Sequence, residues 1–65
     1  MKIGENIKKF RKESGLSQQE LADLVKIHQS NVSRWEKDIS RPDYETLIKL
    51  AEVLGVTIND ILDVD

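Results

Sequence analysis

The chain contains 65 residues, of which 38% are hydrophobic, 34% are charged and none is cysteine, and its formal net charge is -2. A chain of this length is expected to form a single domain, residues 1–65, with little room for the enclosed cavity of an enzyme. With no thiols, no apolar run of membrane-spanning length and no signal-peptide pattern, we expect a cytoplasmic protein without cofactor, metal, membrane partner or small-molecule substrate.

Apolar spacing predicts a first helix near the N-terminus. Ile3, Ile7 and Phe10 recur at intervals of four and three residues, which places them on one face of a helix. Gly15 follows as a residue that tolerates the left-handed conformation and ends the helix.

A second short helix is predicted to begin after Ser17. Ser17 and Glu20 have the spacing of a capping box, in which each side chain accepts a hydrogen bond from the other residue's backbone. The buried stripe of this helix consists of Leu21, Ala22 and Val25. It is expected to end near Lys26, and Ile27 begins the turn that follows.

The stretch QSNVSRWEK, residues 29–37, is predicted to form a third helix with one apolar and one polar face. Val32 and Trp35 share the apolar face because they lie three residues apart. The other face carries Gln29, Ser30, Ser33, Arg34 and Lys37.

Two further helices complete the predicted fold. Pro42 marks a loop, and Asp43 is the expected N-cap of a fourth helix that Gly55 ends. Its buried stripe is Leu47, Leu50, Ala51 and Leu54. Thr57 and Asp60 form a weaker capping box for a fifth helix, which carries Ile58, Ile61 and Leu62. We therefore expect a compact all-α bundle of five helices joined by short connections.

The segment QQELADLVKIHQSNVSRWEK resembles the helix-turn-helix of the Cro and phage-repressor type, the XRE family. The resemblance continues through RPDYETLIKLAEVLGVTINDIL and so covers nearly the whole chain. It implies a five-helix, lambda-repressor-like DNA-binding domain in which helices two and three form the helix-turn-helix. A small residue at the helix crossing, Ala22, is what a tight turn between two steeply crossing helices requires.

The function implied by this resemblance is sequence-specific binding of double-stranded DNA by a transcriptional regulator. A repressor is expected, which would bind a near-palindromic operator as a dimer with helix three in the major groove. Ile58, Ile61 and Val64 are the candidate residues of a small dimer surface, which leaves open that the free protein is a monomer. The sequence also leaves open whether the chain is complete or is the N-terminal domain of a longer repressor.

The resemblance implies that four outward residues of helix three contact bases. In such a register Gln29 reads adenine through its N6 and N7 atoms, and Arg34 is suited to a paired contact with guanine. The candidates are Gln29, Ser30, Ser33 and Arg34. The alternatives are exposed polar residues without a role and, for Arg34, a phosphate contact or a salt bridge.

Phosphate contacts are implied for a second group of residues. In relatives of this family a glutamine at the position of Gln18 bonds a phosphate and braces the one at Gln29, and a buried pair such as Arg11 with Glu36 ties helix one to helix three. The candidates are Arg11, Ser17, Gln18, Asn31, Lys37, Ser40 and Arg41. For the residues of the loop after helix three, a solvated surface is the alternative.

The chain departs from the family pattern at two positions that are usually glycine, Lys26 and Asp38. A positive φ at Lys26 would cost about 1 kcal/mol, whereas Asp tolerates that conformation better. An acid at position 38 would weaken or redirect a nearby phosphate contact. His28 is the only histidine, which argues against a metal site, and it is expected to be an imperfect N-cap or a neighbour of a phosphate.

Charge and surface features support one alternative function. Residues 1–15 contain five Lys or Arg against two Glu, residues 16–42 contain four of each sign, and residues 43–65 contain one Lys against six acids. Because phosphate binding depends on local potential, the acidic last third weakens a DNA interpretation without excluding it. Together with Asp38, it keeps open a protein-interaction or antitoxin-like module that retains the fold. Leu24 and Ile39 are apolar where relatives usually carry polar residues; the alternatives are tolerated surface residues and a small partner-binding patch.

Overall fold

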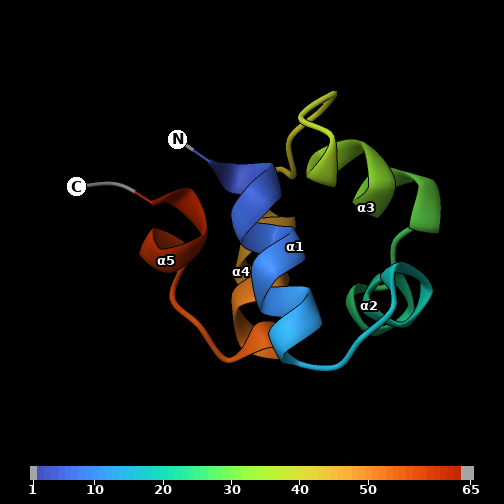
Figure 1. Cartoon of the computed structure of the whole chain (residues 1–65), viewed down its shortest axis with the longest axis horizontal. Helices are drawn as coiled ribbons and strands as arrows, with labels where there is room; N and C mark the ends of the chain where they lie inside the picture. The colour runs from blue at the N-terminus through green and yellow to red at the C-terminus, as the bar shows by residue number, and fades with distance from the viewer. Residues whose placement is uncertain (1, 64–65) are drawn as a thin grey trace.

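The computed structural model describes residues 2–63, and within them the chain forms five α-helices and no β-strand (Figure 1). The helices are α1 (Ile3–Glu13), α2 (Gln18–Val25), α3 (Gln29–Glu36), α4 (Tyr44–Leu54) and α5 (Ile58–Leu62). The predicted all-α, five-helix fold is confirmed. No helix in this part of the chain is both long enough and apolar enough to cross a membrane.

Local side-chain caps with good geometry set the beginnings of α2, α4 and α5. The hydroxyl of Ser17 accepts a hydrogen bond from the backbone N–H of Glu20 (3.0 Å), and the Glu20 carboxylate accepts one from the backbone N–H of Ser17 (2.9 Å). Thr57 and Asp60 form the same capping box at α5, and Asp43 caps α4. The hydrogen bonds from Ser17 lower the pKa of Glu20. These three caps were predicted and are confirmed, because capping depends only on residues close in sequence.

Helix α1 lies at the centre of the arrangement, with α2 and α3 on one side and α5 on the other (Figure 1). It packs against α3 and α5, while α4 packs against α2 and α5. One apolar core joins all five helices; it consists of Ile3, Ile7, Leu21, Ala22, Val25, Val32, Trp35, Leu47, Leu50, Leu54 and Ile61. This arrangement leaves one side of α3 outside the core.

The close approach of α1 to the end of α3 depends on Gly4, which the sequence analysis did not single out. A Cβ atom at this buried glycine would collide with the backbone carbonyl of Trp35 and would lie 2.8 Å from Oδ1 of Asp38. Any side chain at position 4 would therefore push the two helices apart.

Both positions where glycine is usual adopt the left-handed conformation, with φ 58° at Lys26 and φ 59° at Asp38. The strain expected at Lys26 is thus present at the end of α2. The Asp38 carboxylate lies against the first turn of α1, as its distance from the Gly4 position shows. Asp38 therefore lies where the end of α3 meets the start of α1, and it takes part in the packing of these two helices.

One candidate for a dimer surface is wrong. Ile61 is fully buried, with an exposed fraction of 0%, because the inner face of the short α5 packs into the core. Ile58 is half-buried, and Val64 lies outside the described residues.

Candidate nucleic-acid interface

Helices α2 and α3 are joined by a short turn and cross at a steep angle. In Figure 1, α2 is seen nearly end-on while α3 runs across the view. Ala22 has an exposed fraction of 0%, as expected for a small residue at the crossing, and its carbonyl accepts a hydrogen bond from the backbone N–H of Ile27 (3.0 Å). The turn is therefore held by its own backbone as well as by packing.

The two faces of α3 differ as the sequence predicted. Val32 and Trp35 are buried in the core. On the remaining surface Gln29, Ser30 and Ser33 are half-buried and Arg34 is exposed. The four predicted base-contacting residues thus share one short helix whose opposite face is anchored.

His28 caps the start of α3. Its Nδ1 accepts a hydrogen bond from the backbone N–H of Ser30 at 3.4 Å and lies 3.0 Å from the Ser30 hydroxyl. The long backbone bond makes this a weaker cap than Ser17 or Asp43, in agreement with the expected imperfect N-cap.

Four side chains from the first three helices form a continuous series of hydrogen bonds, which we call the polar chain. Gln29 donates from Nε2 to Oε1 of Gln18 (2.7 Å), and Gln18 donates from Nε2 to Oε1 of Glu36 (3.0 Å). Glu36 also accepts from Nε and Nη2 of Arg11, at 2.7 and 3.0 Å. The expected brace between the two glutamines and the expected Arg11–Glu36 pair are both present. The link from Gln18 to Glu36 was not foreseen.

The Arg11–Glu36 pair lies at the inner end of the polar chain. The exposed fractions of the two side chains are 10% and 4%. Burial alone would raise the pKa of Glu36, but hydrogen bonds from Arg11 and Gln18 and the positive charges of Arg11 and Lys8 outweigh it and lower that pKa. The hydrogen bond to Glu36 raises the pKa of Arg11. Both groups are therefore ionised at neutral pH.

The predicted phosphate-contacting residues differ in how accessible they are. Ser17, Lys37, Ser40 and Arg41 are exposed, whereas Gln18 and Asn31 are half-buried. Arg11 directs three of its five N–H groups inward, to Glu36 and to the carbonyl of Leu16. Any contact from Arg11 to a phosphate must therefore use the remaining donors.

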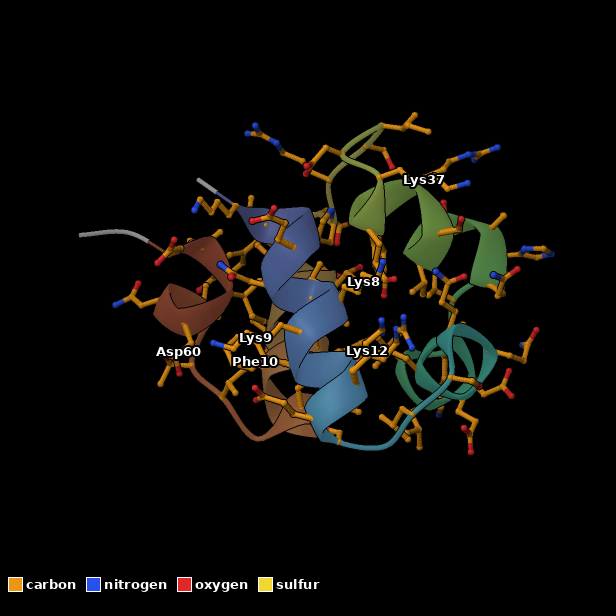
Figure 2. All side chains as sticks on the ribbon, viewed as in Figure 1. Lys8, Lys9, Phe10, Lys12, Lys37 and Asp60 are labelled. Atoms are coloured by element: carbon orange, nitrogen blue, oxygen red, sulfur yellow. The ribbon has the colours of Figure 1, made fainter. Side chains whose placement is uncertain are left out.

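Two lysines of α1 were not included among the candidates. Lys8 and Lys12 extend from α1 on the side of α2 and α3, whereas Lys9 and Asp60 lie on the side of α5 (Figure 2). A spacing of four residues indicates that Lys8 and Lys12 share a face, but not which neighbouring helix that face meets. They add positive charge to the side of the molecule that carries α3.

Within residues 43–63, the acidic last third of the chain does not surround α3. Helix α5 lies across α1 from α3 (Figure 1), and α4 packs on α2 and α5. The charge imbalance along the sequence is therefore also a separation in space, which answers the main electrostatic objection to an anionic partner at α3.

Proteins that resemble this chain include transcriptional regulators of Bacillus subtilis. The regulator ImmR is 34% identical over 65 residues, covering 100% of this chain and 51% of ImmR. The regulator SinR is 37% identical over 62 residues, covering 94% of this chain and 56% of SinR. The chain thus spans about half the length of these relatives.

Solved structures resemble this fold closely. The P22 c2 repressor, in a complex with a synthetic operator, has a TM-score of 0.92 and 28% identity, covering 100% of this chain and 98% of that one. The N-terminal DNA-binding domain of SinR from Bacillus subtilis has a TM-score of 0.88 and 36% identity, covering 97% and 93%. The sequence profile described as helix-turn-helix matches residues 7–61. This chain therefore belongs to the helix-turn-helix family of the Cro and phage-repressor type.

Proposed function

We propose that residues 1–65 form one domain that binds double-stranded DNA sequence-specifically and regulates transcription in the cytoplasm, as a repressor. The observation that carries this proposal is the polar chain, which holds Gln29 at the uncovered face of α3 while Val32 and Trp35 anchor the helix. A helix anchored in this way fits a major groove about 12 Å wide. Family membership and the operator-bound P22 c2 repressor support the same conclusion.

In this proposal α3 reads the bases. Gln29 pairs with adenine through N6 and N7, and Arg34 pairs with guanine through O6 and N7. Ser30 and Ser33 contact the neighbouring base edges. The support for these roles is that all four residues lie on the surface of α3 that the core leaves uncovered.

The remaining candidates contact the DNA backbone and set the orientation of α3. They are Arg11, Ser17, Gln18, Asn31, Lys37, Ser40 and Arg41. Ser17 uses its hydroxyl oxygen as the acceptor of the α2 cap, so its O–H remains available to donate to a phosphate oxygen. We add Lys8 and Lys12 as sources of long-range attraction, because they extend on the same side of α1 (Figure 2).

We further propose that two copies bind a near-palindromic operator with their recognition helices one helical turn apart, about 34 to 36 Å. Ile58 is the remaining described candidate for contact between the copies, since it is only half-buried on α5. With Ile58 as the one candidate left within residues 2–63, we expect a small contact, and therefore a protein that is monomeric when free and dimeric on DNA.

The function is tested by selecting bound duplexes from a random library with the purified chain, followed by titration of the enriched duplex at several salt concentrations. We expect a two-fold symmetric motif and an affinity that falls steeply with salt. A folded chain that enriches no motif and binds duplexes weakly at every salt concentration would instead favour the protein-interaction or antitoxin-like module.

Two substitutions separate base reading from backbone contact. Gln29→Ala is expected to lose about 1 to 3 kcal/mol on the preferred site and to relax the preference for the base it reads. Arg41→Ala is expected to weaken binding to all sequences alike and to reduce the salt slope by about 1. Fluorescence titrations of both variants on matched and altered duplexes measure these effects. An unchanged base preference in Gln29→Ala would remove its assigned role.

A further inference from the structure

The buried carboxylate of Glu36 determines which way the amide of Gln18 faces. An ionised carboxylate only accepts hydrogen bonds, and Glu36 has an exposed side-chain fraction of 4%, so water is largely absent as an alternative partner. Gln18 lies 3.0 Å from Oε1 of Glu36 and must turn its NH₂ group, not its carbonyl, toward it. The reverse orientation would place two oxygen atoms against each other.

The orientation of the Gln18 amide in turn fixes the orientation of the Gln29 amide. With its NH₂ group on Glu36, Gln18 presents Oε1 to Gln29, which must answer with its own NH₂ group at 2.7 Å. This leaves Oε1 and the second N–H of Gln29 for other partners. All buried polar side-chain atoms within residues 2–63 have partners, so the polar chain in this direction leaves no buried group unsatisfied.

We propose that Glu36 is a positioning residue for sequence recognition: acting through Gln18, it fixes the order of donor and acceptor that Gln29 presents to DNA, and thereby the preference for adenine over guanine. This inference rests on the proposed function. Adenine offers an acceptor at N7 and a donor at N6, which match one N–H and Oε1 of Gln29. Guanine offers acceptors at both N7 and O6, so Oε1 of Gln29 would face another oxygen.

Fixing the orientation of Gln29 is a different role from stabilising the fold through the Arg11–Glu36 ion pair. Arg11 and Glu36 would tie α1 to α3 whatever the orientation of the glutamine amides. If Glu36 becomes a glutamine, only one oxygen remains for the donors of Arg11 and Gln18, which reach both oxygens of the carboxylate in the wild type. Where the amide turns its NH₂ group toward Gln18, both glutamines of the polar chain reverse. The reversed Gln29 presents a donor where adenine also has a donor, so the distinction between adenine and guanine is reduced.

The direction of the polar chain can be measured in the free wild-type protein. Nuclear magnetic resonance detects scalar couplings across hydrogen bonds, from the donor nitrogen to the carbon that bears the acceptor oxygen. We expect a coupling from Nε2 of Gln29 to Cδ of Gln18. A coupling from Nε2 of Gln18 to Cδ of Gln29 would show the opposite direction and overturn the proposal without any use of DNA.

The effect on recognition is tested with Glu36→Gln and with Glu52→Gln, which removes the same charge from an exposed position on α4. Each is titrated with duplexes that carry adenine or guanine at the base read by Gln29. We expect the ratio of the two affinities to fall at least about fivefold in Glu36→Gln and to stay unchanged in Glu52→Gln.

Gln18→Met provides a second route if Glu36→Gln does not fold, because it leaves the Arg11–Glu36 pair intact and interrupts the polar chain. It is expected to show the same loss of preference for adenine. If the wild type prefers adenine and Glu36→Gln or Gln18→Met keeps that preference, the role of Glu36 is overturned while the proposed function stands. A wild-type chain with no base preference at all would overturn both.

Discussion

The side of the molecule formed by α1, α2 and α3 and the acidic side formed by α4 and α5 are built by the same local rules but are connected differently. Side-chain hydrogen bonds link all three helices of the first side through Arg11, Gln18, Gln29 and Glu36. On the second side, the side-chain hydrogen bonds within residues 43–63 are helix caps. One further bond, from Asn6 of α1 to the carbonyl of Ile61, ties α5 to α1.

The difference shows what each kind of contact achieves. Apolar packing places both sets of helices, and it does so without fixing how any polar group is oriented. A buried series of hydrogen bonds is costly unless every member is satisfied, but when satisfied it defines the orientation of each group in it. This protein uses such a series where α3 presents Gln29, and relies on packing and caps elsewhere.

The largest expected effect comes from breaking the buried pair. Arg11→Met leaves the Glu36 carboxylate buried without its cationic partner, so the free energy of unfolding should fall by about 4 kcal/mol. Urea denaturation at pH 7, followed by circular dichroism, measures this loss.

A double variant tests whether the loss comes from the unpaired charge of Glu36. Arg11→Met combined with Glu36→Leu removes both charges, and its stability should return to within about 1 kcal/mol of the wild type. If the single variant alone loses less than about 1 kcal/mol, the pair is not effectively buried and the contrast between the two sides of the molecule is weaker than described.

The next effect tests how closely α1 approaches α3. Gly4→Ala should destabilise the fold by about 2 kcal/mol, because the new methyl group would overlap the carbonyl of Trp35. Helix propensity alone would favour alanine by about 1 kcal/mol, so the sign of the change decides between the two effects. Glu5→Ala, at an exposed neighbouring position, is the control and should change the free energy of unfolding by less than about 0.5 kcal/mol.

Features that depend on neighbours in sequence were predictable, and those that depend on distance between helices were not. The capping boxes at Ser17 and Thr57 follow from a spacing of three residues. Glycine is required at position 4 because α1 packs closely on the end of α3, and a contact between helices that are far apart in sequence leaves no local pattern. Ile61 was assigned to the surface because the apolar pattern of a five-residue helix does not show which side meets the core.

The candidate site was predictable to a similar extent. The outward face of α3 follows from the positions of Val32 and Trp35, whereas the brace between Gln18 and Gln29 was expected only through family resemblance. The bond from Gln18 to Glu36 joins residues 18 apart in sequence, and no local pattern indicates such a contact.

A smaller effect concerns the one side-chain hydrogen bond that joins the two sides within residues 2–63. Asn6→Ala removes the donor to the carbonyl of Ile61 (2.9 Å) and should cost about 1 kcal/mol. Amide hydrogen exchange should show the loss of protection concentrated in α5. Asn59→Ala, at an exposed position on α5 itself, should leave exchange there unchanged; equal losses in both variants would mean that the Asn6 bond contributes nothing specific.

The smallest effect is a gain in stability at the turn between α2 and α3. Lys26 holds φ 58°, which costs a residue with a Cβ atom about 1 kcal/mol, while glycine loses about 0.5 kcal/mol more entropy on folding. Lys26→Gly should therefore stabilise the fold by about 0.5 kcal/mol, measured as a higher urea midpoint. Lys26→Ala loses the same charge but keeps the strain, so it should bring no gain. If both variants shifted the midpoint equally, charge rather than backbone conformation would be the cause, and the strain at this turn would be negligible.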